Sequence, residues 1–331
     1  MGRKSNLLVL SAKTESALET ATDNLVEHFR KHPELDLVDV AYTLQVGRKE
    51  FNYRRMVVGK DIEDVAIALQ SKEPQKVLTH HTLKNNHSIV FMFPGQGSQY
   101  ANMGKELYET EPVFREWIDR CSRLLEPELG LDLRSLIYPV GAIRESPLQL
   151  HTSHAFHSPM MDKAIAPLTQ AVAKVKLNPP QIPFISNVTG TWITAEEAIN
   201  PHYWAKHARE TVRFAAGISE LLQDKDRILL EVGAGRTLST FVKRNTAQSA
   251  GQIVLSSLPH PKETVSDIAF ILNMLGRLWL AGVEIDWCNF SADKQRRRVP
   301  LPTYPFERQH YWIDPVVSPT TPRVSARKMK L

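Results

Sequence analysis

Hydrophobic and polar residues follow two different periods along the first quarter of the chain. Short apolar runs at residues 6–10 and 53–59 have the length and β-branched content of strands. Apolar residues three and four positions apart predict helices after the candidate caps Ser11 and Thr14, and at residues 37–46 and 62–70. Residues 71–87 are mostly polar and predict a connector. Strands alternating with helices predict a small α/β unit over residues 1–87.

A second unit begins at residue 88 with the continuous apolar run 89–93, which is typical of a buried parallel strand. "PGQG" follows at its carboxyl end, where open α/β sheets bind ligands. Gly95 and Gly97 allow a sharp turn that leaves backbone N–H groups free for an anion. Gln96 between them adds a side-chain amide that can donate to an oxyanion. A plain strand-to-helix turn is the alternative interpretation.

Later segments continue the same alternation. Strands are predicted at residues 182–190, 227–232 and 252–258, and a helix over 264–281 is predicted to be capped by Gly282. Residues 132–150 show little pattern and predict a link. The end of the chain is proline-rich and predicts an extended segment, with disorder after residue 315.

Composition excludes several classes of function. Hydrophobic residues make up 42% and charged residues 23%, the balance of a soluble globular protein. Two cysteines are too few for a disulfide framework or a cysteine-based zinc site, and we expect a cytoplasmic location. We find no secretory pattern, no membrane span and no nucleic-acid motif. The net charge of +5 still allows an acidic partner.

Three histidines stand three residues apart in "HTSHAFHSP", residues 151–159. Two of them could bring imidazoles together on a helix, but Ser158-Pro159 favours a bend over a third helical ligand. We therefore predict no metal site. A catalytic base with its pocket and a solvated loop both remain open from the residues alone.

The order of several motifs carries a family resemblance. "FPGQGSQY", "HTSHAFHSPMMD", "YWAKHARETVRFAAGI", "LEVGAGRTLS" and "VPLPTYPFERQHYW" together resemble the acyltransferase domain of modular type I polyketide synthases with its flanking linkers. The resemblance implies an α/β fold in four parts. These are a ketosynthase-to-acyltransferase linker domain (1–87), a truncated acyltransferase core of α/β-hydrolase-like type (88–299), a linker docking on the first domain (300–315) and a disordered tail (316–331).

The resemblance also implies roles for individual residues. His157 matches the general base, Gln96 the oxyanion-hole glutamine, and His154 and Phe156 shape the substrate pocket with the Gly95–Gly97 turn. "HAFH" is the form associated with malonyl selection. The implied activity is transfer of malonyl from coenzyme A to a serine, then to the phosphopantetheine thiol of an acyl carrier protein. No bound cofactor is expected; an acyl carrier protein and a neighbouring ketosynthase are the expected partners.

The chain departs from the family at the nucleophile. The serine should stand in a G-x-S-x-G turn, yet no two glycines of this sequence are four positions apart. In the family a long segment carries that turn, a substrate-binding arginine and a ferredoxin-like subdomain; here residues 140–150 replace it. Ser153 and Ser158 flank His157, but neither stands on such a turn. We expect an inactive scaffold or docking element. An active malonyl transferase with an unrecognised nucleophile and a non-functional truncated product remain alternatives.

Overall fold

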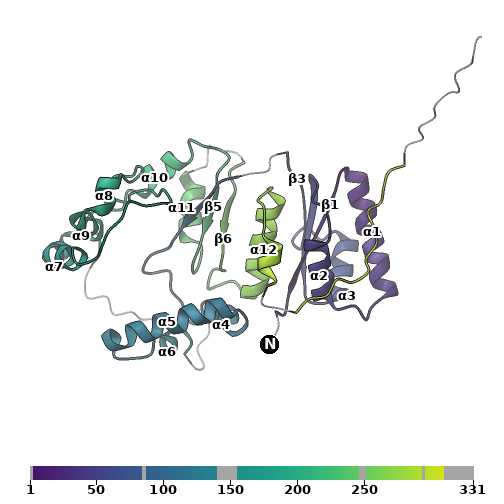
Figure 1. The fold of residues 1–331 in the computed structure, drawn as a ribbon, viewed down its shortest axis with the longest axis horizontal. Coiled ribbons are helices and arrows are strands. Elements are labelled where there is room, and N and C mark those ends of the chain that lie inside the picture. Colours follow the sequence, from purple (N-terminus) through teal and green to yellow (C-terminus); the bar gives the residue numbers. More distant parts are fainter. Residues whose placement is uncertain (1–2, 84–86, 140–154, 246–250, 293–294, 309–331) are drawn as a thin grey trace, which may run out of the picture.

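The protein is a mixed α/β structure built on two three-stranded sheets. The computed structural model describes residues 3–83, 87–139, 155–245, 251–292 and 295–308. The two sheets lie side by side along the long axis, and helix α12 (Asp267–Leu280) stands between them (Figure 1). The α/β fold class predicted from the sequence is confirmed.

The first sheet is antiparallel, with the strand order β1-β2-β3. Its strands are β1 (Asn6–Ala12), β2 (Tyr53–Gly59) and β3 (Val77–His81). Helices α1 (Glu15–Lys31), α2 (Leu37–Val46) and α3 (Ile62–Ser71) pack with Leu8 and Val57 on one face. The opposite face carries Leu7 and Met56, which pack against α12. Both faces of this sheet are therefore covered, one of them by a helix about 200 residues later in the chain.

The elements of the first unit match the sequence prediction with one exception. Thr14 caps α1, since its side chain accepts a hydrogen bond from the Ala17 N–H at 3.2 Å. The prediction of a polar connector over residues 71–87 is wrong, because β3 lies within it. This strand forms the edge of the sheet and buries only Val77, so its remaining positions tolerate polar residues such as His80 and His81.

The second sheet is parallel, with the strand order β4-β5-β6. Its strands are β4 (Ile89–Met92), β5 (Ile228–Glu231) and β6 (Val254–Ser256). Helices α10 (Phe214–Leu221) and α11 (Thr237–Asn245) pack on one face, and Leu278 of α12 packs on the other beside Ile228. Helix α12 thus contacts both sheets and connects the two halves of the molecule.

Two strand predictions in this half need correction. Residues 182–190 form only a single bridge, Ile185 to Trp192, because the chain turns tightly at Gly190, whose φ is 77°. Strand β4 exists, but it is not buried as predicted: Phe91 is 57% exposed and Phe93 71% exposed. Since β4 is an edge strand, no other described strand pairs with its free side.

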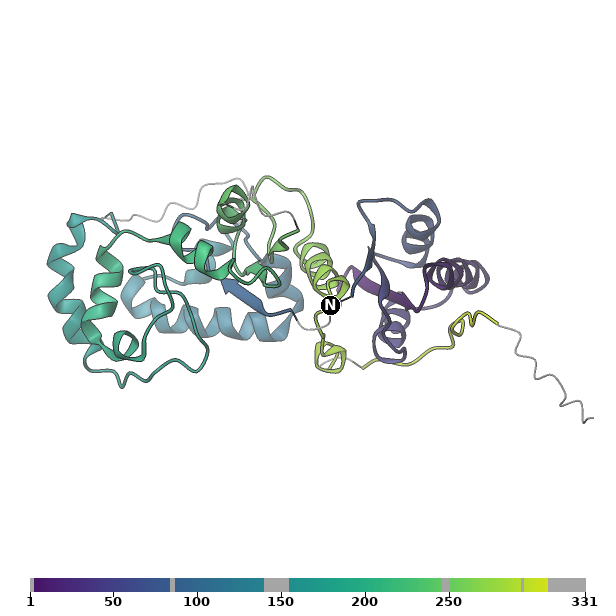
Figure 2. The ribbon, with the colours of Figure 1, turned by 90° about the horizontal axis from the view of Figure 1, so that it is seen from above.

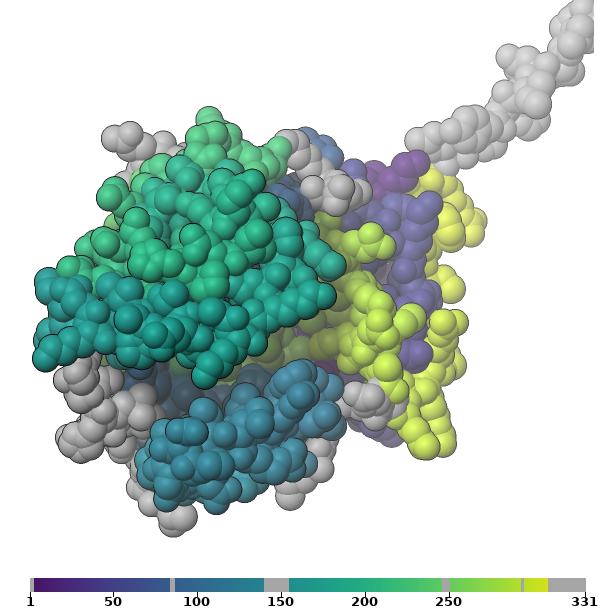
Figure 3. Space-filling view, turned by 60° about the vertical axis from the view of Figure 1, so that its left-hand side comes forward, coloured from purple at the N-terminus to yellow at the C-terminus, as the bar shows by residue number. Residues whose placement is uncertain are grey.

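Two groups of helices flank the second sheet. One consists of α4 (Lys105–Thr110), α5 (Pro112–Leu129) and α6 (Leu133–Ile137); α6 falls in the stretch predicted to be irregular. The other consists of η1 (Pro159–Met161), α7 (Asp162–Val172), α8 (Ala195–Ile199) and α9 (Pro201–Arg209). The space-filling surface is hollowed between the two groups (Figure 3). In the described part of the chain, no helix is long and apolar enough to cross a membrane.

The end of the described chain runs along the first unit (Figure 2). The Val299 N–H donates to Thr43 Oγ1 at 3.0 Å, and the Lys13 N–H donates to Tyr304 Oη at 3.0 Å. The side chains of Val299 and Leu301 pack against the core of the first unit. The boundaries at 87 and 299 remain predictions, and the expected disordered tail lies outside the described residues.

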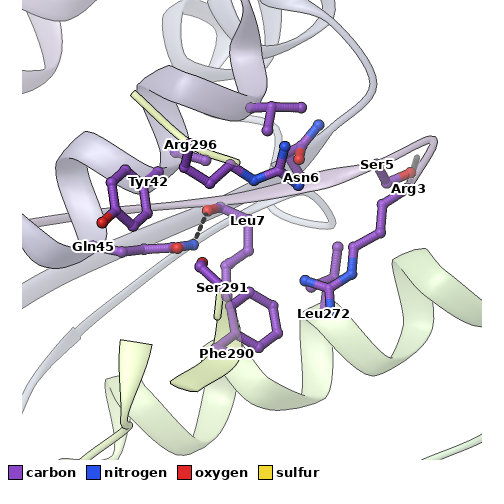
Figure 4. Close-up of a pocket in the computed structure, with 12 residues that line it drawn as sticks. Arg3, Ser5, Asn6, Leu7, Tyr42, Gln45, Leu272, Phe290, Ser291 and Arg296 are labelled. Carbon is purple, nitrogen blue, oxygen red and sulfur yellow. Dashed lines mark hydrogen bonds between the residues drawn. The ribbon is translucent and has the colours of Figure 1, made fainter. Parts of the chain in front are cut away.

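The junction of the two halves encloses a small pocket beside β1, α2 and α13 (Trp287–Phe290) (Figure 4). Gln45 Nε2 donates to the Leu7 carbonyl at 2.8 Å. The Arg3 guanidinium lies 4.2 Å from the centroid of the Phe290 ring and pairs with Glu111 at 2.7 Å. The Arg3 side chain of this pocket therefore already has an acidic partner.

Candidate functional site

His157 is held by two backbone contacts. Its N–H donates to the Ala208 carbonyl at 3.0 Å, and its Nδ1 lies 2.8 Å from the Glu210 carbonyl oxygen. A carbonyl oxygen can only accept, so in the neutral ring Nδ1 carries the proton and Nε2 keeps its lone pair. The residue has φ 57°, a left-handed conformation that is uncommon outside glycine. The arrangement orients an exposed imidazole whose free nitrogen can act as a base.

A second histidine packs against the first. The ring centroids of His157 and His207 are 6.0 Å apart, edge to face, and Asn187 Nδ2 lies 3.2 Å from His207 Nε2. Burial lowers the pKa of His207, and the nearby His157 lowers it further. A neutral His207 therefore avoids adding a second charge beside the candidate base.

The supporting residues around His207 received no role from the sequence. Tyr203 is buried and donates to Ser186 Oγ at 2.8 Å, and Trp204 stacks edge-on against it. The segment "YWAKHARE" that contains them was singled out only as a family motif. The i, i+4 spacing of Tyr203 and His207 on α9 was the available signal that these side chains share a face.

The hydroxyl next to His157 in the chain is already engaged. Ser158 Oγ donates to the Ala155 carbonyl at 2.6 Å and accepts from the Met160 N–H at 3.3 Å, so it caps η1. Phe156 is 46% exposed beside them. Three further candidates, His151, Ser153 and His154, lie outside the described residues.

The Gln96 turn follows β4 and is exposed at Gly95, Gln96 and Gly97. Gly97 has φ 98°, which explains the glycine. The Gly97 N–H donates to Gln99 Oε1 at 2.7 Å, so this N–H is not free for an anion as predicted. Within the described residues, no hydrogen bond joins the Gln96 turn to His157.

Two other chemistries can be weighed from the same part of the molecule. The described residues hold no group of three His, Cys, Asp or Glu side chains placed to bind a metal ion. The turn "GAGRTLS" resembles a phosphate loop, but the N–H groups of Leu238 and Ser239 donate to the buried Glu231 carboxylate at 3.1 and 2.8 Å. The carboxylate therefore occupies the position that a phosphate would take.

Comparisons with known proteins connect this geometry to a family. The profile of the acyl transferase domain matches residues 90–142 and 141–285, more than half of the chain. The chain belongs to the acyl transferase domain family. A second profile, described as CurL-like, PKS C-terminal, matches residues 6–69 in front of this acyl transferase domain. The two matched segments of the first profile meet at residues 141–142, within the stretch where the sequence predicts a missing segment.

The relatives of this acyl transferase domain are polyketide synthases. One component of the phenolphthiocerol/phthiocerol polyketide synthase of Mycobacterium tuberculosis (strain CDC 1551 / Oshkosh) is 24% identical over 447 residues, covering 93% of the chain and 30% of that protein. Polyketide synthase GfsA of Streptomyces halstedii is 33% identical over 179 residues, covering 54% of the chain and 2% of that protein. The chain thus spans less than a third of the length of these relatives.

Solved acyltransferase structures share the fold. The acyl transferase domain of ZmaA has a TM-score of 0.82 at 26% identity, with 91% of this chain and 100% of that chain covered. The acyl transferase domain of SpnD has a TM-score of 0.73 at 23% identity, with 85% and 97% covered. The alignment with the mycobacterial synthase runs over 447 residues while this chain has 331. At least 116 aligned positions of that synthase, the difference of the two lengths, therefore have no counterpart here.

Proposed function

We propose that this acyl transferase domain is a non-catalytic scaffold or docking element of a polyketide synthase. It keeps the candidate base and the glycine–glutamine turn of the family but lacks the serine that would carry the acyl group. Its family activity would be the transfer of malonyl from coenzyme A to an acyl carrier protein. An acyl carrier protein and a ketosynthase are the partners proposed for the scaffold.

One observation carries the proposal: His157 is oriented as a base, and within the described residues no hydrogen bond joins its ring to a serine hydroxyl. Its Nδ1 faces the Glu210 carbonyl, which leaves Nε2 free, while the adjacent Ser158 hydroxyl is used to cap η1. The sequence contains no G-x-S-x-G turn. Acyl transfer through a serine ester requires both groups within hydrogen-bonding reach, and removal of a catalytic serine lowers turnover by roughly a million-fold in a well-studied hydrolase.

A transfer assay tests this proposal. The full chain is incubated with malonyl-coenzyme A and a phosphopantetheinylated acyl carrier protein, and malonyl-carrier protein is followed by mass spectrometry. The positive control is an acyl transferase domain that loads the same carrier protein with malonyl under the same conditions. The proposal predicts a rate no higher than the rate without protein. Catalytic loading of the carrier protein that disappears in His157→Ala would overturn it.

A scaffold must also fold cooperatively, which a non-functional truncated product need not do. Differential scanning calorimetry of the full chain is expected to give a single transition whose calorimetric and van't Hoff enthalpies agree. The reason is that α12 packs against both sheets, so neither half can unfold without exposing part of the core of the other. A broad transition without a measurable enthalpy peak would favour the truncated product.

A further inference from the structure

One edge of the parallel sheet is open. Strand β4 pairs only with β5, and the Ser88 and Met92 carbonyls accept hydrogen bonds from that side. Because alternate residues of a strand direct their N–H and C=O groups to opposite edges, those of Ile89 and Phe91 point to the free edge. An edge strand with unpaired backbone groups is a template for another strand. No strand of the described chain occupies this edge.

Large apolar side chains stand next to the open edge. Phe91 is 57% exposed and Phe93 is 71% exposed, and their ring centroids are 6.4 Å apart. Both lie on the face of β4 opposite Met92, which packs in the core with α10 and α11. Natural edge strands are usually protected by charged residues or by proline within the strand, and this strand has neither. The edge therefore has the features of a surface that another polypeptide covers.

Helix α5 presents a second uncovered apolar surface. Of its 18 residues only Ser122 is buried, and among helices and strands it packs substantially only against α4 and α6. Val113, Trp117 and Leu124, which are 59%, 56% and 68% exposed, recur at the spacing of one helix face. An amphipathic helix whose apolar face meets solvent lacks a packing partner.

The comparisons show that a relative carries chain that is missing here. The mycobacterial synthase carries at least 116 aligned residues, 447 less 331, that this chain lacks. The family match breaks at residues 141–142, between α6 and η1, which belong to the two helix groups on either side of the hollow in Figure 3. The break in the family match thus follows α6, which packs against α5.

We propose that the edge of β4 and the apolar face of α5 form a docking site for a separate polypeptide that supplies a β-strand and an apolar surface. This proposal deepens the proposed scaffold function, on which it rests, by naming what the scaffold holds. A strand added parallel to β4 would end beside the Gln96 turn, since parallel strands share one carboxyl edge. The occupant is therefore a strand-forming segment of another acyl transferase domain, equivalent to the residues missing here.

A second copy of this chain is the competing occupant. Two copies related by a two-fold axis through β4 would pair two strands of only four residues each. A second copy lacks the same residues, so it cannot replace them. A segment equivalent to the at least 116 missing residues, 447 less 331, can replace them. Self-association is nonetheless a distinct outcome of the test.

The probe is a purified fragment of the mycobacterial polyketide synthase that comprises the aligned residues without a counterpart here. Light scattering of the mixture is expected to show a 1:1 complex. Cys121 lies on α5 one turn after Trp117, and Cys288 lies on α13; both thiols are exposed. The complex should slow alkylation of Cys121 roughly tenfold and leave Cys288 unchanged, because only Cys121 lies on the proposed surface.

Paired variants identify the contact. Phe91→Ser with Phe93→Ser should weaken binding of the fragment at least roughly tenfold, since interface energy is concentrated in buried aromatic anchors. The control is Phe306→Ser, which removes a phenylalanine that is 77% exposed on the segment at the other end of the molecule. It should leave binding unchanged.

Three results would overturn the docking proposal. They are no complex at about 100 μM of each protein, a complex that the Phe91/Phe93 variant binds as well as the parent chain, and a dimer of the chain alone that already protects Cys121. Binding is measured without malonyl-coenzyme A. Failure of docking would therefore leave the transfer assay unaffected, and a positive transfer assay would contradict the scaffold function without removing the docking site.

Discussion

Trp279 joins the two halves of the molecule, and its removal tests that joint. The side chain is 1% exposed, and its Nε1 donates to Glu50 Oε1 at 2.8 Å. The Arg54 guanidinium lies 4.9 Å from the ring centroid and donates to the Trp279 carbonyl at 2.6 Å. Trp279→Ala keeps the carbonyl contact but removes the ring from the core that α12 shares with β1 and β2.

The expected loss follows from burial. Truncating a fully buried tryptophan to alanine costs about 3–5 kcal/mol through lost burial and the cavity left behind. The cation–π contact adds about 1 kcal/mol, because the Arg54 side chain is only 5% exposed and has little water to replace the ring. The expected loss of about 4–6 kcal/mol is a large part of a typical net stability of about 5–15 kcal/mol.

Urea unfolding followed by circular dichroism measures this difference in unfolding free energy. The matched control is Trp117→Ala, the same substitution at a ring that is 56% exposed on α5. Its expected effect is within about 0.5 kcal/mol. Equal losses in the two variants, or a loss below about 1 kcal/mol for Trp279→Ala, would refute the conclusion that α12 holds the two halves together.

Two further substitutions test the stability of the first unit and its packing against α12. Hydrogen bonding from Arg55 is the main cause that lowers the pKa of Glu19 from 4.5 to about 2, so the stabilisation is complete above pH 4.5 and is lost as pH falls through about 2. Glu19→Gln should lower the unfolding free energy by about 1–2 kcal/mol at pH 7. Urea titrations of the variant and the parent chain measure this difference. An equally large difference near pH 2 would contradict the role of the Glu19–Arg55 pair. Gly276→Leu should destabilise by about 1–3 kcal/mol because an added Cβ already meets Met56 Sδ and lies 3.0 Å from Leu7 Cδ1. The same substitution at Gly95, with open space around it, should be tolerated, and equal thermal shifts for the two would contradict the packing.

Local sequence signals predicted the helices and most strands of the first unit. They did not predict which element covers the second face of the sheet. Leu7 and Leu8 are consecutive and point to opposite faces, so both faces of β1 had to be buried. That pattern predicts two covering layers, but not that the second layer is α12, since no local rule connects residues 7 and 276. Strand β3 was missed because an edge strand needs few apolar positions.

The sequence predicted individual residues of the candidate site but not their arrangement in space. The family motifs pointed to His157 and Gln96, and the geometry of His157 is consistent with a base. The orientation of its ring depends on the Glu210 carbonyl, which is 53 residues away and has no sequence signature. The exposure of Phe91 and Phe93 was missed because an apolar run predicts burial only when neighbouring elements are present.

The central claim is that this acyl transferase domain has kept a base and lost its nucleophile. Intact-protein mass spectrometry after incubation of the chain with malonyl-coenzyme A tests it most directly, because an acyl-enzyme ester is the obligatory intermediate of serine-dependent transfer. The mass of the chain is expected to remain unchanged. A stoichiometric malonyl adduct that is absent in His157→Ala would contradict it, and mapping the modified residue would identify the nucleophile.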